Sequence, residues 1–228
     1  MGLEIMSRHI YLSYILDENT PSYGNRNSFV VNKNADMSKG DPVNDTSIST
    51  TVHMGTHIDM PYHFFENGQT IIDFDIDFFD SKKVLFIEIK PQDLIIKGDL
   101  IERLEQISNK QDCEFLIVKT GICYERSESK FWESNYGFDP SVAIYLRENY
   151  PNIRIIGFDS ISVSSFQNRI LGRVAHKEFL SPESPILLLE DMDLREVNEN
   201  MKFDRVTIAP MRIANSDGLP CTVIAEVR

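Results

Sequence analysis

Cysteine is scarce in this chain, and the few copies are poorly placed for cross-linking. Only 3 of its 228 residues are cysteine: Cys113, Cys123 and Cys221, none of them in a Cys-x-x-Cys pair. A chain of this length can bury a core that needs no disulfide staples. The odd, scattered set argues against a disulfide framework and favours reduced thiols in a cytoplasmic protein.

Basic tracts and long apolar runs are also missing. The formal net charge is −12, so we expect neither nucleic acid nor an anionic membrane surface as a partner. Near the N-terminus the apolar residues are interrupted by Glu4, Arg8, His9 and Asp17. That interruption argues against a signal-peptide core or a membrane span in this segment.

Histidine is rare too, but it is concentrated in one place. Three of the five histidines lie between Thr51 and Phe65, and Asp59 lies between the second and the third. Imidazole and carboxylate groups at this density are the ligands that a borderline-soft divalent metal prefers. The alternative is a set of partly buried histidines satisfied by hydrogen bonds, which is less probable for so dense a cluster than for a lone histidine.

Backbone geometry limits how this segment can surround a metal ion. His53, Gly55, His57 and Asp59 share one parity, so on a strand they point to the same face. His57 and Asp59 would lie about 7 Å apart at Cα, but His53 and His57 about 13 Å apart, too far for one ion. We therefore expect the chain to bend at Gly55.

A helix is the competing local structure for this segment. It would place His53 and His57 one turn apart on one face, as in metal-binding helices. Gly55, the β-branched residues after it and Pro61 disfavour a helix. Pro61 also ends any strand because it has no N–H to donate, so we expect His63 to reach the site from a turn.

The rest of the chain alternates apolar runs with amphipathic segments. This alternation predicts an α/β (α+β) fold with a mixed sheet in a single domain over residues 1–228. Asp99 and Asp139 are expected N-caps of two helices, and the polar segment 25–46 is expected to be an exposed loop or a lid. The predicted strands are 9–15, 84–89, 114–119, 153–158 and 186–190, and the predicted helices are 99–109 and 140–149.

Two residues of the second half are the expected remaining ligands. His176 is the only histidine after residue 63, and Glu190 closes the apolar run 186–189. Burying that carboxylate is costly unless a cation pairs with it. Asp191 or Asp193 could replace Glu190 if the register slips, and His176 could be an ordinary histidine of a surface helix.

Asp159 and Ser160 follow a predicted buried strand. The carboxyl ends of strands are a common place for site residues in α/β sheets. The alternative role for Asp159 is a helix or turn cap.

The histidine cluster closely resembles the signature of one family. The run His53-x-Gly55-Thr56-His57-x-Asp59-x-Pro61-x-His63-Phe64 is similar to that of the cyclase-like metal-dependent hydrolases, which include bacterial kynurenine formamidases and isatin hydrolases. The similarity continues at His176 with Phe179-Leu180, at Glu190, and at Asp217-Gly218-x-Pro220. The resemblance implies the swivelling β/β/α type of fold.

The resemblance also implies roles for individual residues. His63 would stay unligated as proton donor and acceptor, and a metal-bridging hydroxide would be the nucleophile. The expected cofactor is zinc, two ions per chain, with manganese as the alternative. By position the metal ligands are His53, His57 and Asp59 for one ion, with Asp59, His176 and Glu190 for the second.

The implied activity is hydrolysis of a small-molecule amide. The specific expectation is an arylformamidase that cleaves N-formylkynurenine to kynurenine and formate, in a homo-oligomer (dimer or tetramer). Tyr23 stands where kynurenine formamidases typically carry a substrate-contacting tryptophan, and Phe64 is a second expected substrate contact. The alternatives are another cyclic or aryl amide, or a lactone, as for isatin hydrolase, and a non-catalytic metal-binding domain.

Overall fold

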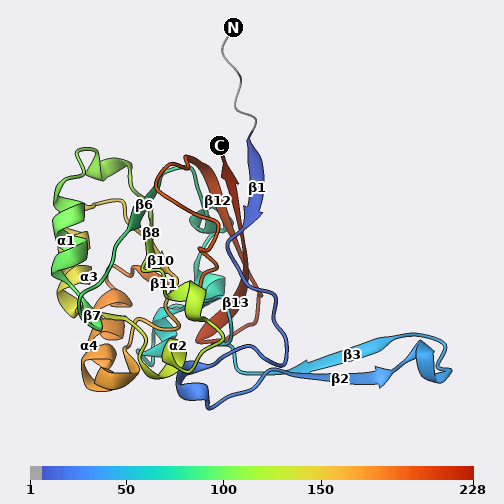
Figure 1. The fold of residues 1–228 in the computed structure, drawn as a ribbon. Coiled ribbons are helices and arrows are strands. Elements are labelled where there is room, and N and C mark those ends of the chain that lie inside the picture. The colour runs from blue at the N-terminus through green and yellow to red at the C-terminus, as the bar shows by residue number, and fades with distance from the viewer. Residues whose placement is uncertain (1–6) are drawn as a thin grey trace, which may run out of the picture.

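A mixed β-sheet joins segments from both ends of the chain (Figure 1). The structure, a computed structural model, describes residues 7–228; Glu4, part of the N-terminal interruption noted above, lies outside this range. The sheet strands are β1 (Arg8–Tyr11), β4 (His57–Asp59), β5 (Asp80–Ser81), β6 (Val84–Glu88), β8 (Phe115–Lys119), β10 (Ile155–Phe158), β11 (Leu187–Glu190), β12 (Phe203–Pro210) and β13 (Gly218–Val227).

The sheet has a parallel half and an antiparallel half that meet at β4. Its order is β5-β12-β13-β4-β11-β10-β8-β6, and β1 pairs with β13. Strands β6, β8, β10 and β11 run parallel to their neighbours in this half, whereas β4 runs antiparallel to both β11 and β13. The predicted mixed sheet of an α/β fold is therefore confirmed. The apolar runs in β8, β10 and β11 are buried throughout, as expected for strands covered on both faces.

Helices cover the parallel half. Figure 1 shows α1, α3 and α4 together on one side of the parallel strands. Leu104 of α1, Leu146 of α3 and Phe179 of α4 are fully buried in the core. The helix bounds are α1 (Gly98–Glu105), α2 (Lys130–Glu133), α3 (Pro140–Asn149) and α4 (Arg169–Phe179).

The two predicted helix starts differ in outcome. Asp139 is the N-cap of α3, with its side chain accepting from Ser141 N, and the helix ends at Asn149 as predicted. The prediction for Asp99 was wrong, because α1 starts at Gly98 and Lys97 holds the N-cap position. The Asp99 carboxylate instead accepts a 3.3 Å hydrogen bond from Gln92 N in the preceding loop.

The segment expected to be an exposed loop or lid is mostly a hairpin. Strands β2 (Val30–Ala35) and β3 (Asp45–Ser49) pair only with each other and project away from the sheet (Figure 1). The tip is ordered by Asp36, whose Oδ1 accepts from Ser38 N at 2.9 Å. A turn stabilised by an aspartate side chain is a signal for a hairpin, even in a segment dominated by polar residues. A further two-stranded sheet joins β7 (Ile95–Ile96) to β9 (Gly137–Phe138).

Several elements are shorter than predicted. The helix predicted to end at 109 ends at Glu105, and the strand predicted to begin at 153 begins at Ile155. The predicted strand 9–15 ends early, because β1 stops at Tyr11 and only Ser13 continues with an isolated bridge to Met192. The motif strand is also short, since only His57–Asp59 of it pairs in the sheet. Within residues 7–228, no helix is both long and apolar enough to cross a membrane.

Replacing the α3 cap tests the local origin of that helix. Asp139→Ala should lower the free energy of unfolding by about 1 kcal/mol, whereas Asp139→Asn, which keeps the cap, should change it far less. Burial raises the pKa of Asp139, but hydrogen bonds from Ser141 outweigh it and hold the pKa below the ordinary 3.8. The stabilisation is therefore present above pH 3.8 and is lost as the pH falls through the folded-state value. Urea titrations of the three proteins at neutral and acidic pH measure both effects; equal losses for both variants would contradict the capping role.

Candidate metal centre

The register of β4 brings the candidate ligands together. His57 lies opposite Glu190 of β11, and Asp59 lies opposite Gly218 of β13. Asp217 comes just before β13, so it reaches the same end of β4. Strand pairing thus brings together three segments that are distant in sequence.

The backbone bends at Gly55, as predicted. Its φ is +65°, a left-handed backbone conformation that favours glycine. The bend returns His53 toward the strand, and its ring centre lies 5.2 Å from that of His57. Pro61 opens a 3₁₀ turn that carries His63 to within 4.1 Å of the His53 ring centre. The predicted bend and turn are both confirmed.

Two imidazoles and two carboxylates form the floor of the site. His57 Nε2 lies 3.4 Å from Asp59 Oδ1 and 3.4 Å from Glu190 Oε2. His176 Nε2 lies 3.5 Å from Asp59 Oδ2 and 3.9 Å from Glu190 Oε1. All four side chains are buried. Each carboxylate therefore offers one oxygen to each imidazole.

Hydrogen bonds to the backbone fix the tautomer that both floor imidazoles adopt when they are neutral. His57 Nδ1–H donates to the Gly55 carbonyl at 2.8 Å, and His176 Nδ1–H donates to the Gly172 carbonyl at 2.9 Å. The neutral rings then point the lone pair of Nε2 at the carboxylates. Asp59 Oδ2 is buried, and no group in the described part of the chain hydrogen-bonds to it. Lone pairs that face one another in this way call for a cation between them.

The spacing of these donors fits a divalent metal. Ligands that share a tetrahedral ion at about 2.0–2.1 Å lie about 3.3–3.4 Å apart, because the edge of a tetrahedron is about 1.6 times its centre-to-corner distance. Three of the four separations at the floor, 3.4, 3.4 and 3.5 Å, are close to this edge, and the fourth, between His176 and Glu190, is longer at 3.9 Å. All four exceed the usual lengths of hydrogen bonds. Mixed imidazole and carboxylate donors suit zinc or manganese.

Electrostatics at the floor favour positive charge. Burial lowers the pKa of His57, but Asp59 and Glu190 outweigh it and hold that pKa well above its usual value. Burial raises the pKa of Asp59, but His53, His176 and His57 outweigh it and hold that pKa well below its usual value. The attraction that binds a proton at the imidazoles is the one that would bind a metal ion.

A second tier of groups lies above the floor. His53 Nδ1 lies 2.8 Å from Asp59 Oδ1, and His53 Nε2 lies 2.8 Å from Asp217 Oδ2. The same Asp217 oxygen lies 2.9 Å from His63 Nδ1. His53 and His63 hold the pKa of Asp217 well below its usual range. Burial lowers the pKa of His53, but Asp59 and Asp217 raise it to about 9.

Donor atoms close enough for one ion occur in three overlapping sets. In the described part of the chain they are His53 with His57 and Asp59, Asp59 with His63 and His176, and His53 with His63 and Asp217. The structure thus gathers His53, His57, Asp59, His63 and His176, and Glu190 completes the floor.

The alternatives to Glu190 point elsewhere. Asp191 accepts two hydrogen bonds from the Arg126 guanidinium, at 2.9 and 2.7 Å. Asp193 pairs with Arg195 at 2.7 Å. Glu190 lines the cavity described below, with Oε1 accepting from Val163 N at 2.7 Å.

Asp159 has the cap role, outside the site. Its carboxylate accepts from Thr120 N at 2.9 Å and from Gly121 N at 2.8 Å. It is buried and caps the turn after β8.

A cavity of about 300 Å³ opens over the floor. Both expected substrate contacts line it. Phe64 stacks on His176 with ring centres 4.5 Å apart and meets His63 edge-on at 4.7 Å, so it also orients both imidazoles. Tyr23 also lines the cavity, and its buried hydroxyl oxygen has no hydrogen-bond partner within residues 7–228.

Sequence reasoning missed several residues in or beside this cavity. Asp217 was noted only as part of a resemblance, although a carboxylate just before a glycine-led strand was the available signal. Ser164, whose Oγ lies 3.2 Å from His176 Nδ1, carried no signal of its own. Three exposed arginines, Arg26, Arg169 and Arg173, also line the cavity.

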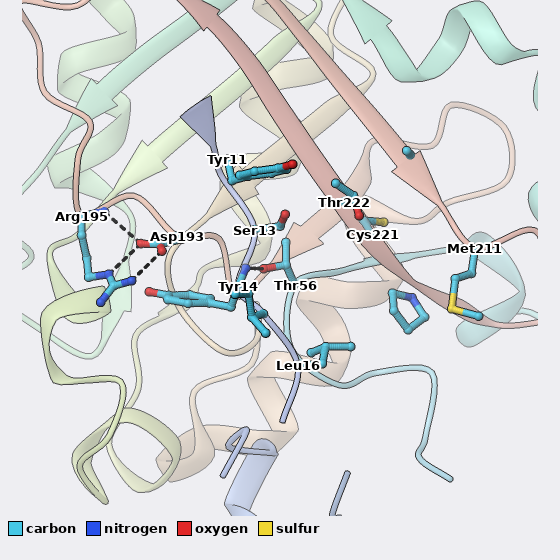
Figure 2. Close-up of a pocket in the computed structure, with 13 residues that line it drawn as sticks. Tyr11, Ser13, Tyr14, Leu16, Thr56, Asp193, Arg195, Met211, Cys221 and Thr222 are labelled. Carbon is cyan, nitrogen blue, oxygen red and sulfur yellow. Dashed lines mark hydrogen bonds and ion pairs between the residues drawn. The ribbon is translucent and has the colours of Figure 1, made fainter. Parts of the chain in front are cut away.

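A larger cavity, about 780 Å³, has a different character (Figure 2). Figure 2 shows Tyr14 and Leu16 facing Met211 and Cys221 around it. Its lining contains no histidine and is largely apolar. Its one acidic side chain is Asp193, which is paired with Arg195. The smaller cavity is therefore the one that can support metal chemistry.

Comparison with known proteins agrees with this geometry. The Cyclase family model matches residues 10–165 of the chain. The kynurenine formamidase of Geobacillus thermodenitrificans is 27% identical over 216 residues, which cover 95% of this chain and 96% of that protein.

Solved structures share the fold. A protein described as a potential metal-dependent hydrolase with cyclase activity superposes with a TM-score of 0.75 at 22% identity, covering 98% of this chain and 99% of its own. Isatin hydrolase A from Ralstonia solanacearum gives a TM-score of 0.79 at 16% identity, covering 97% and 92%. Since the family model spans more than half of the sequence and includes the motif at residues 53–63, this chain belongs to the cyclase family.

Proposed function

We propose that this chain is a metal-dependent amide hydrolase. The observation that carries the proposal is the buried floor, in which Asp59 and Glu190 each present one oxygen to His57 and one to His176. Such bridging carboxylates suit a pair of divalent ions, and we propose zinc, with manganese as the alternative. Bound there, the metal would lower the pKa of a water molecule and polarise the scissile carbonyl. The proposed ligands are His53, His57, Asp59, His176 and Glu190.

His63 is the proposed proton shuttle. Its Nδ1 lies 2.9 Å from Asp217 Oδ2, so the Nδ1–H is held by that carboxylate. The other ring nitrogen, Nε2, is then the one that can take a proton from water and pass it to the leaving nitrogen. His63 lines the cavity and is half-buried, which leaves it accessible to a substrate. Asp217 acts as a positioning residue that orients this ring.

The proposed reaction is cleavage of an aryl formamide. Water adds to the formyl carbon of N-formylkynurenine, the C–N bond breaks, and the products are kynurenine and formate. The kynurenine formamidase relative, which aligns over 95% of this chain, supports this substrate. The proposal includes a single domain over residues 1–228 and a cytoplasmic location.

The proposed function has two alternatives: a different substrate, and a non-catalytic structural metal site. The fold shared with isatin hydrolase supports a cyclic amide or a lactone, with manganese. Tyr23, in the place of a tryptophan, also allows a different substrate. A purely structural zinc site is closed by four protein ligands, and the open cavity beside His63 favours catalysis over that role.

Metal content tests the ligand assignment. The purified protein should contain about two zinc ions per chain, as expected for a two-metal site. His176→Ala should lose at least one, because the second ion would keep only the carboxylates of Asp59 and Glu190 as proposed ligands. His9→Ala, an exposed histidine of β1, is the matched control and should keep both ions. Elemental analysis by mass spectrometry gives the stoichiometry. Equal metal content in the two variants would show that His176 is not a ligand.

Turnover tests the proton shuttle. His63→Ala should lower kcat for N-formylkynurenine by about 10²–10⁴-fold, the usual contribution of a general acid–base, while metal content stays unchanged. Chelation should abolish activity, and added zinc or manganese should restore it. An active wild type whose His63→Ala variant keeps full kcat would remove the role of His63. No turnover by the metal-loaded wild type would remove this substrate.

The hairpin of β2 and β3 supports a proposed homo-oligomer, a dimer or tetramer. It projects from the sheet and exposes Val30, Met37, Val43 and Ile48, the last with 53% of its surface accessible (Figure 1). Ile48→Asp should shift the protein to a smaller species in light scattering, because it places a charge in an apolar contact. Ser49→Asp adds the same charge to the opposite strand face and should not shift it. A monomeric wild type would contradict the proposal.

A further inference from the structure

Three arginines at the cavity opening have no carboxylate partner. Arg26, Arg169 and Arg173 line the cavity, and within residues 7–228 none of them forms an ion pair. We call them the arginine rim. Seven of the nine other arginines in this chain of net charge −12 are paired with carboxylates of the described residues, all but Arg8 and Arg212. Unpaired cations gathered beside one cavity of an acidic protein indicate an anionic ligand.

Two of the three rim arginines lie on the helix that carries a floor imidazole. Arg169 and Arg173 are four residues apart, so they lie one turn apart on the α4 helix that carries His176. The guanidinium carbons of Arg26 and Arg169 lie 5.5 and 5.2 Å from the Phe166 ring centre. Cation–π contacts of this kind restrict side chains that would otherwise move freely in solvent. The rim is therefore partly ordered before a ligand binds.

A hydroxyl donor accompanies the rim. Tyr23 packs edge-on against Phe166 at 5.4 Å, and its buried hydroxyl has no hydrogen-bond partner. Burial raises the pKa of Tyr23 to about 12, although Arg169, Arg26 and Arg173 each lower it. At neutral pH the group is therefore an O–H donor. A buried donor without a partner is costly unless a ligand accepts its hydrogen bond.

We propose that the arginine rim and the Tyr23 hydroxyl bind a carboxylate of the substrate, remote from the amide that is cleaved at the floor. Guanidinium groups recognise carboxylates with paired hydrogen bonds. A carboxylate held at the opening is kept from the floor, where it would compete with the scissile carbonyl for the cation. This inference rests on the proposed hydrolase function and narrows it, since it favours an amide with an anionic tail over a neutral cyclic amide or lactone.

A matched substrate pair tests the rim. N-formylkynurenine and its carboxamide share the formamide, the ring and the ammonium group, and they differ only in the carboxylate. Wild type should prefer the carboxylate, and Arg173→Gln or Arg169→Gln should lower kcat/KM for it by roughly tenfold or more, as for the loss of a hydrogen bond to a charged group. Turnover of the carboxamide should change little. Tyr23→Phe, which keeps the ring, should show the same selective loss.

Controls separate the rim from the hydrolase function. Arg103→Gln removes an arginine paired with Glu199 outside the cavity, and it should leave the preference unchanged. Two outcomes would contradict the carboxylate site while supporting the hydrolase function. In one, the wild type cleaves both substrates equally well; in the other, it prefers the carboxylate and the rim variants keep that preference. If neither substrate is cleaved, calorimetry with kynurenine and kynurenine amide decides. Tighter binding of kynurenine that Arg173→Gln removes supports the rim, and equal binding overturns it.

Discussion

The buried opposition of two carboxylates and two imidazoles is the constraint on which the site depends. Asp59 and Glu190 lie in the sheet with almost no solvent contact, where an uncompensated charge is strongly destabilising. Backbone carbonyls hold the Nδ1–H groups of His57 and His176, so both rings turn their Nε2 atoms toward these carboxylates. The arrangement is self-consistent only with positive charge at its centre, which a divalent cation supplies.

Strand pairing makes this arrangement rigid. β4 is only three residues long, but it pairs on both sides, with β11 and β13. The register fixes Glu190 beside His57, and the approach of β13 places Asp217 over the imidazoles. Gly218 makes this approach possible, because a Cβ there would lie 2.4 Å from His53 Cε1. Side chains on paired strands keep fixed positions relative to one another, so the site keeps its geometry.

One helix carries residues of both the proposed metal site and the proposed carboxylate site. α4 places His176 at the floor and, through the periodicity of 3.6 residues per turn, Arg169 and Arg173 along the same side at the cavity opening. Phe64 stacks on His176, and Phe166 contacts Arg169. A displacement of α4 would therefore disturb the proposed metal ligand and the proposed carboxylate site together.

The sequence by itself determined the local parts of this protein. The density of histidine around Asp59, the bend at Gly55 and the turn after Pro61 follow from side-chain chemistry and backbone sterics within a few residues, and the structure has all three. Asp139 likewise capped its helix as predicted. Local signals failed where a neighbouring segment competes for the same side chain. The Asp99 carboxylate, predicted to cap a helix, accepts a hydrogen bond from Gln92 N instead.

Only the tertiary structure decided which distant groups meet. Strand order depends on how the whole sheet packs, so no local pattern showed that β13 lies beside β4 and delivers Asp217. The choice of Glu190 over Asp191 required knowing that Arg126 reaches the latter. No sequence pattern predicted the arginine rim. Arg26 and Arg173 are far apart in the sequence, and only folding brings them to one cavity.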